Sequence, residues 1–236
     1  MTSAHPPPSE REPRGARRKR ETRDKLLRAA FRLISERGVD AVAINEITEE
    51  ADVGFGSFYN HFPSKEAVYD EVFRLVFEEF GDALERLTSH LEDPAEVISV
   101  CIRHTILRAE LEPRWARFLL RESLTPSGIL RGLAARLMRD IHIGLDSKRL
   151  DVADPLTALM MAGGTVMAAI AVQAAHQAEP AAAKRLGFEM KHVAERTAAT
   201  VLSGLGIRAA EADKIARRRL PAFQKPPSSL SYEPSA

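Results

Sequence analysis

Cysteine is almost absent from this chain, because Cys101 is the single one among 236 residues. A lone thiol cannot form an intramolecular disulfide, and it cannot make a four-cysteine zinc site. This usage is typical of a reducing cytoplasm, and we expect Cys101 to act as a small apolar side chain. The sequence predicts no metal site and no cofactor.

Catalytic motifs are missing as well. The seven histidines include His90, His104, His142 and His176, but the chain has no H-E-x-x-H, no G-x-S-x-G and no phosphate-binding glycine loop. Catalysis would therefore need unrelated residues to meet without a recognisable spacing. The sequence predicts no catalytic residue, and a helical enzyme stays only as an alternative.

Export and membrane signals are weak. The first fourteen residues are rich in proline and polar side chains and lack the apolar core of a signal peptide, so the expected compartment is the cytoplasm. One run without charge, Leu156 to Ala178, is long enough to cross a bilayer. Eight alanines, two glycines and several polar residues make it only modestly hydrophobic, so we expect a buried helix and no membrane association.

Neither sign of charge is in large excess overall, since the formal net charge is +1. The first 65 residues hold twelve basic and ten acidic side chains, a difference of +2. Within them, Arg14 to Lys25 carries seven basic residues against Glu21 and Asp24. This excludes a uniformly basic polyanion binder and leaves one local patch suited to phosphate.

Two short helices around a glycine-containing turn are the most informative pattern present. Apolar residues at Ile44, Ile47, Ala51 and Val53, and then at Phe58 and Phe62, give each short helix one apolar side. A longer basic helix precedes them, from Arg18 to Arg37, and Gly38 supplies its stop. This layout is typical of a helix-turn-helix that reads DNA.

Several motifs occur together at a specific spacing: L-L-R-A-A-F-R-L-I-S-E-R-G at 26–38, Ile44 with Ile47, the turn at 52–54, and F-Y-N-H-F-P-S-K-E at 58–66. From about Arg20 to Phe80 the chain resembles the DNA-binding domain of the TetR family of bacterial transcriptional regulators. The resemblance implies an all-α protein. It also implies a homodimeric repressor that binds a palindromic double-stranded DNA operator and is released by a small apolar or amphipathic effector.

Four regions are expected on this basis. Residues 1–16 form a disordered, basic and proline-rich arm, and residues 17–65 form the three-helix DNA-binding domain. Residues 66–220 form a larger helical domain for effector binding and dimerisation, and residues 221–236 form a disordered tail. Ser64 is the expected N-cap of a long helix that runs to Leu87 and connects the two domains.

The remaining chain shows no alternating strand pattern, and prolines divide it into helical segments. The expected segments are 94–110, 114–123, 129–145, 155–178, 181–206 and 209–220.

The resemblance places residues 53–61 in the major groove. Asn60 suits an adenine edge, and Tyr59 and His61 suit phosphate oxygens. The family commonly has arginine or lysine where this chain has Phe55, which could contact a thymine methyl instead. Packing within the small domain is the alternative for Tyr59 and His61. The predicted DNA-binding residues are Asn45, Phe55, Gly56, Ser57, Tyr59, Asn60, His61 and Lys65.

An effector pocket and a dimer interface are implied in the larger domain, with plain core packing as the alternative for each residue. The predicted pocket residues are Phe77, Cys101, His104, Trp115, Phe118, Arg121, Met138, His142, Met160 and Met167. The predicted interface residues are Gly163, Gly164, Ala168, Ala171, Val193, Thr197 and Val201. Arginines such as Arg108 and Arg117 could suit an acidic effector or be solvated. A ligand-independent architectural DNA-binding protein is the second alternative.

Overall fold

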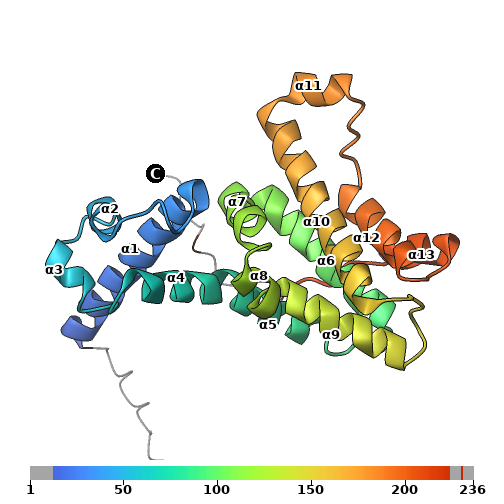
Figure 1. Cartoon of the computed structure of the whole chain (residues 1–236), viewed down its shortest axis with the longest axis horizontal. Helices are drawn as coiled ribbons and strands as arrows, with labels where there is room; N and C mark the ends of the chain where they lie inside the picture. Colours follow the sequence, from blue (N-terminus) through green and yellow to red (C-terminus); the bar gives the residue numbers. More distant parts are fainter. Residues whose placement is uncertain (1–12, 224–229, 231–236) are drawn as a thin grey trace, which may run out of the picture.

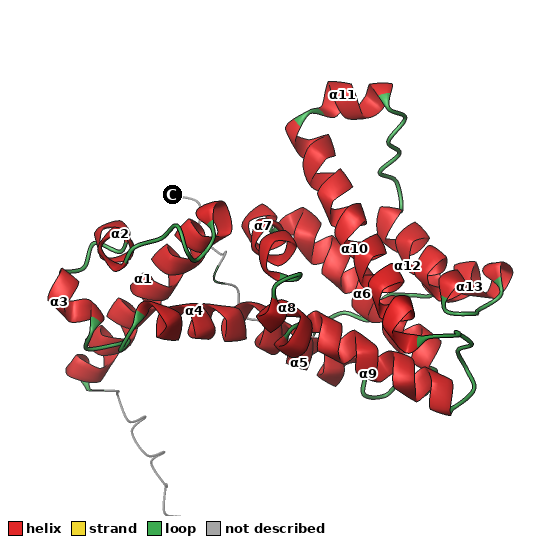
Figure 2. Ribbon diagram, in the orientation of Figure 1, coloured by secondary structure: helices red, strands yellow, loops and turns green. Residues whose placement is uncertain are grey.

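The computed structural model describes residues 13–223 and 230, and every regular element within them is helical (Figure 2). The predicted all-α class is confirmed. The predicted arm at 1–12 and most of the predicted tail, at 224–229 and 231–236, lie outside the described residues.

The first three helices are α1 (Arg14–Arg37), α2 (Ile44–Glu50) and α3 (Phe55–Phe58). Their apolar faces meet in one core, which includes the buried side chains of Leu26, Phe31, Ile34, Ile47, Phe58 and Phe62. Helix α1 begins at Arg14 rather than Arg18, so the last residues of the predicted arm are helical. This part of the molecule lies at one end in Figure 1.

Helix α3 ends earlier than the expected His61. The N–H groups of Asn60 and His61 donate to the carbonyls of Ser57 and Phe58, at 3.2 and 2.9 Å, which are three-residue turns instead of four-residue helical turns. Pro63 follows directly and disfavours helical backbone at the residue before it. Residues 59–61 therefore form a turn at the end of the reading helix.

The connection between the domains is α4 (Lys65–Phe73), a π-helical turn η1 (Arg74–Glu78) and α5 (Glu79–Thr88). The predicted N-cap is confirmed, since the Ala67 N–H donates to Ser64 Oγ at 3.3 Å. The π-turn is a difference from the predicted continuous helix. Such turns insert an extra residue and occur mostly at functional sites.

Eight helices follow: α6 (Pro94–Leu111), α7 (Pro113–Glu122), α8 (Pro126–Arg131), α9 (Leu133–Asp146), α10 (Pro155–Ala178), α11 (Pro180–Arg185), α12 (Val193–Gly204) and α13 (Ala209–Ala216). Proline occupies the first turn of α6, α7, α8, α10 and α11, as expected. Helix α6 lies at the centre and contacts α7, α9, α10 and α12.

Two predicted helices are each divided in the structure. The expected helix at 129–145 breaks at Gly132, which has extended backbone between α8 and α9. The expected helix at 181–206 breaks between α11 and α12, where Gly187 and His192 have positive φ angles of 72° and 57°. Left-handed backbone cannot continue a right-handed helix, so α11 and α12 are separate helices.

Helix α10 is buried along one side only. Ala158, Ala162, Val166, Ile170 and Gln173 face the domain, whereas Leu156 and Met160 are 57% and 65% exposed. The expectation of a fully buried helix is therefore corrected. Among the described residues α10 is long and apolar enough to cross a membrane by length and composition, with 22% of that window buried. Its second half and α11 project from the rest of the molecule (Figure 1).

The beginning of the predicted disordered tail is packed. The Phe223 ring lies 4.5 Å from the His104 ring and 6.4 Å from the Phe80 ring, between centroids. His104 Nε2 is 2.9 Å from the Pro221 carbonyl. The ordered chain therefore continues at least to Phe223, because an aromatic side chain finds apolar cover there.

Candidate DNA-reading surface and effector cavity

The predicted reading surface is exposed. Phe55 and Tyr59 are 53% and 51% exposed, and their rings meet edge to face with centroids 5.7 Å apart. Asn60 and Gly56 are exposed beside them, Ser57 is half-buried, and Phe58 packs into the core behind. Two large aromatic rings kept in water on one face are a surface suited to contact with another molecule.

His61 lies half-buried at the end of this surface. Its Nδ1 is buried and has no hydrogen-bond partner among the described residues. Burial lowers the pKa of His61, and the nearby charges of Lys19 and Arg23 lower it further. The basic first half of α1 therefore flanks the reading surface beside His61.

The other two predicted DNA-binding residues differ in their contacts. Asn45 is exposed in the first turn of α2. The Lys65 ammonium is half-buried and donates to the Val39 carbonyl at 3.1 Å, which ties the start of α4 to the loop after α1. Lys65 thus has a structural contact that its motif did not indicate.

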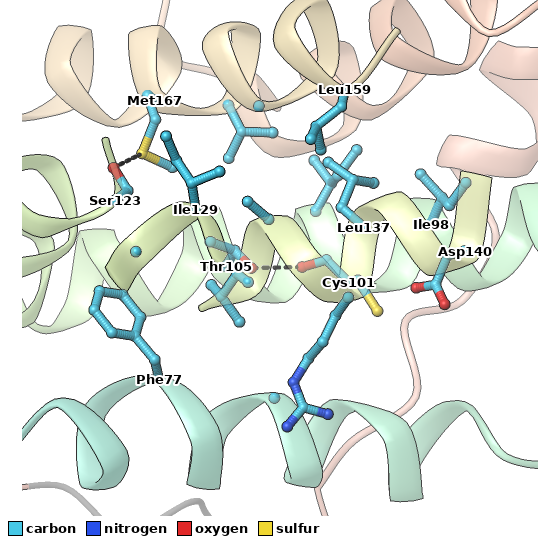
Figure 3. A pocket seen from close by; sticks show the side chains of 18 of the residues that line it. Phe77, Ile98, Cys101, Thr105, Ser123, Ile129, Leu137, Asp140, Leu159 and Met167 are labelled. Atoms are coloured by element: carbon cyan, nitrogen blue, oxygen red, sulfur yellow. Dashed lines mark hydrogen bonds between the residues drawn. The ribbon is translucent and has the colours of Figure 1, made fainter. Parts of the chain in front are cut away.

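A cavity of about 580 Å³ lies between α5, α6, α8, α9 and α10 (Figure 3). Its lining is mostly apolar, as small-molecule sites are. Four predicted pocket residues line it: Phe77, Cys101, Met160 and Met167. Burial raises the pKa of the Cys101 thiol to about 12, so this group stays protonated and unreactive.

The other six predicted pocket residues lie outside the lining. Trp115 and Phe118 are fully buried core residues, His104 packs against the chain near Phe223, and Arg121 donates to the Glu36 carbonyl at 2.9 Å. Met138 and His142 do not line the cavity, and His142 is exposed. Aromatic and sulfur-bearing residues suit a filled core as well as a cavity, so residue type alone could not separate the two.

Sequence reasoning missed the charged end of the cavity. Arg136 and Arg139 both pair with Glu85, Arg136 also reaches Asp82 at 2.6 Å, and Arg139 reaches Asp140 at 2.9 Å. Burial raises the pKa of the Asp140 carboxyl, although Arg139 acts against this. The available signal was the spacing of 136, 139 and 140, which places all three on neighbouring turns of one helix.

Arg136 crosses α5 at Gly81. A Cβ atom at Gly81 would lie 2.2 Å from Arg136 Nε, so any side chain there would displace the guanidinium. This close approach explains why glycine occupies the middle of an α-helix, where it is otherwise unfavourable.

The predicted interface residues are divided between three environments. Gly163 and Gly164 line the cavity, and Ala168 and Ala171 are exposed on the outer face of α10. Thr197 and Val201 are buried within the domain, where α12 packs on α6, and Val193 is half-buried. Thr197 and Val201 thus lie on the side of α12 that packs inside the subunit, and their role in a dimer interface stays a prediction.

Comparison with known families shows to which family this chain belongs. The family model described as bacterial regulatory proteins, tetR family, matches residues 26–72. The model described as tetracyclin repressor-like, C-terminal domain, matches residues 93–218, which is more than half of the chain. The chain belongs to the TetR family.

One solved structure resembles most of the chain. The crystal structure of RolR in complex with resorcinol is 34% identical, covers 89% of this chain and 100% of its own, and superposes with a TM-score of 0.62. The repressor KstR2 of Mycolicibacterium smegmatis is 36% identical over 74 residues, which are 30% of this chain and 36% of KstR2. The regulator AcrR of Shigella flexneri is 33% identical over 95 residues, 40% of this chain and 44% of AcrR. The matches to these two curated relatives thus span less than half of their lengths.

In this TetR-family member the cavity wall is connected to the DNA-binding domain through residues of α7. The ring of Phe118 lies 5.6 Å from Phe77, which lines the cavity, and 5.5 Å from Phe31 of α1. Tyr69 of α4 donates to the buried Glu122 carboxylate at 2.8 Å, one residue before Ser123 of the lining. A continuous chain of packed rings and one hydrogen bond therefore joins the cavity to α1 and α4.

Proposed function

We propose that this protein is a homodimeric transcriptional repressor in the cytoplasm, which leaves a palindromic operator when a small effector fills the cavity. TetR-family regulators bind DNA and typically act as dimers. One observation carries the proposal: Phe77 of the cavity wall packs on Phe118, and Phe118 packs on Phe31 of α1 in the DNA reader. Occupancy of the cavity can therefore bias the position of the reader.

The proposed DNA contacts follow from exposure and chemistry. Asn60 pairs with a base edge, and Phe55 and Tyr59 add apolar and hydroxyl contacts in the groove. Gly56 permits close approach, while His61 and Lys19 meet phosphate. Ser57, Lys65 and Asn45 are proposed to make additional contacts with the DNA backbone. Phosphate contacts position the domain, and Asn60 supplies the sequence preference.

The proposed effector is a small molecule with a mostly apolar body. RolR was solved with resorcinol, a hydroxylated aromatic ring, and that class is a reasonable first candidate for this related chain. Release works as a population shift, since the effector must bind the released state better than the DNA-bound state. A change from almost fully bound to almost fully released requires roughly 5.5 kcal/mol of differential binding.

The exposed face of α10 is the proposed dimer surface. Leu156, Met160 and Gly164, which also border the cavity, and then Ala168 and Ala171 follow one another along this face at helical spacing. Their small or flexible side chains allow a second copy of α10 to approach closely. We expect Ala171→Glu to weaken the dimer about tenfold, because two carboxylates would be buried near the symmetry axis. Sedimentation velocity across a concentration series measures this.

Gln177→Glu is the matched control for dimerisation, since Gln177 is exposed on α10 but away from this face. It should leave the dimer intact. Equal dissociation of the two variants, or an unchanged Ala171→Glu dimer, would place the interface elsewhere.

His61 predicts a pH dependence of operator binding. Burial, Lys19 and Arg23 lower its pKa in the free protein, and a phosphate beside the ring would raise it again in the complex. Binding then takes up a proton, so affinity rises as pH falls from 8 to 6, by at most about tenfold per unit. His61→Gln should reduce this slope, and His90→Gln, which changes an exposed histidine, should not. Equal slopes in all three proteins would contradict the contact.

Footprinting on the DNA that flanks the gene tests the proposed function. We expect a two-fold symmetric protected site with half-sites about one helical turn, or a small multiple, apart. Added effector candidates, resorcinol first, should remove the protection. Protection without symmetry or sequence preference would favour an architectural DNA-binding protein instead.

A further inference from the structure

The hydroxyl groups that line the cavity are left as hydrogen-bond acceptors. The Thr88 hydroxyl donates to the Leu84 carbonyl at 2.9 Å. The Thr105 hydroxyl donates to the Cys101 carbonyl at 2.8 Å, and Ser123 donates to the Met167 sulfur at 3.2 Å (Figure 3). Each hydroxyl has thereby used its only proton and keeps lone pairs. The lining hydroxyls cannot satisfy an effector that brings only acceptors.

Asp140 is the strongest of these acceptors. It is 8% exposed, yet it lines the cavity beside Cys101, at the end away from Phe77 and Met167 (Figure 3). Arg139 donates twice to Asp140, from Nε at 3.1 Å and from Nη2 at 2.9 Å, and both bonds go to Oδ1. Within the described chain, no hydrogen bond reaches Oδ2. This oxygen is not among the fully buried polar atoms, so its lone pairs are open to a donor on a ligand in the cavity.

The charges around Asp140 disfavour ionic effectors. The carboxylates of Asp82, Glu85 and Asp140 face the guanidinium groups of Arg136 and Arg139 in one cluster. Both arginines already pair with carboxylates, so neither offers a free charge to an anionic head group. A cationic head group would lie beside both arginines. A neutral head group avoids both the repulsion between an anion and the carboxylates and the repulsion between a cation and the arginines.

We propose that Asp140 Oδ2 accepts a hydrogen bond from the hydroxyl group of a neutral, mostly apolar effector. This inference rests on the proposed function, because it names the effector class of the same cavity. Asp140 then favours binding of an effector with a hydroxyl group over one with an ether or a carboxylate on the same ring. The apolar wall from Phe77 to Leu159 accommodates the body of the molecule.

Three probes that differ only in the head group test the proposal by calorimetry on the full chain without DNA: 4-ethylphenol, 4-ethylanisole and 4-ethylbenzoate. The phenol should bind about tenfold or more tightly than the anisole, since a hydrogen bond to a charged acceptor is among the stronger ones. The benzoate should bind most weakly. In Asp140→Asn the preference for phenol over anisole should fall to about twofold.

Asp82→Asn is the matched control, because it removes a carboxylate from the same cluster without touching the lining. It should keep the full preference for the phenol. Equal binding of phenol and anisole, tightest binding of the benzoate, or no binding of any probe would overturn the inference. A protein that binds the phenol through Asp140 but keeps its operator would refute only the proposed release, since the calorimetry contains no DNA.

Discussion

Asn60→Ala will weaken operator binding by about five- to 150-fold, which corresponds to roughly 1–3 kcal/mol for a bidentate contact between asparagine and adenine. Asn60 is exposed in the turn after α3, so its removal leaves the core of the small domain unchanged. Fluorescence anisotropy on the footprinted duplex measures the loss. The same variant should bind a scrambled duplex as the wild type does, because a base contact adds nothing to non-specific binding.

Lys19→Ala separates a base contact from a phosphate contact. Lys19 is exposed on α1, close enough to His61 to lower the pKa of that residue. Its loss should weaken binding to both duplexes and reduce the slope of log affinity against log salt by about 1 per subunit, or about 2 for the dimer. Asn60→Ala should keep the wild-type slope. If Asn60→Ala weakens both duplexes alike, Asn60 does not read sequence.

Gly163→Leu will make the protein insensitive to effector while leaving operator affinity intact. Gly163 lines the cavity, and no atom of a neighbouring element lies within 4 Å of the position that a Cβ would take. The leucine side chain therefore enters the cavity without a clash and occupies effector volume. Leucine is also the better helix former by up to about 1 kcal/mol, so stability should not fall. Loss of effector-dependent release in the anisotropy assay is the expected result.

Gln177→Leu is the control for this variant, since it adds the same side chain to an exposed position of the same helix. It should release DNA normally. A Gly163→Leu protein that becomes monomeric and loses operator binding would instead place Gly163 in the dimer interface.

The DNA-binding domain could be predicted from the sequence because its motif lies within a short stretch of the chain. The run from Phe58 to Glu66 combines core aromatics, exposed polar residues and a helix cap within nine positions, and each structural role depends on near neighbours. The early end of α3 was missed because residues 59–61 carry no glycine or proline that would indicate a turn. The π-turn at Arg74–Glu78 has no sequence signal that we could recognise.

The cavity was only partly readable because it depends on which space remains unfilled. Trp115 and Phe118 have the composition of pocket walls, yet both are fully buried: Phe118 packs on Phe31 and Phe77, and Trp115 packs on Phe80 and Arg108. Asp140 and its arginine neighbours look like a solvated helix face in the sequence. Only the packing of α9 on α6 and α10 shows that Asp140 is covered and faces the cavity. Such long-range placement is not encoded in a periodicity of three or four residues.

Anisotropy of the wild-type protein with DNA from beside its own gene and with a scrambled duplex, over a salt series, tests the central claim most directly. We predict a tight, saturable preference for the native duplex that persists as salt rises, with two subunits bound per operator. Absence of binding to either duplex at low salt would contradict the assignment of residues 53–61 as a DNA-reading surface.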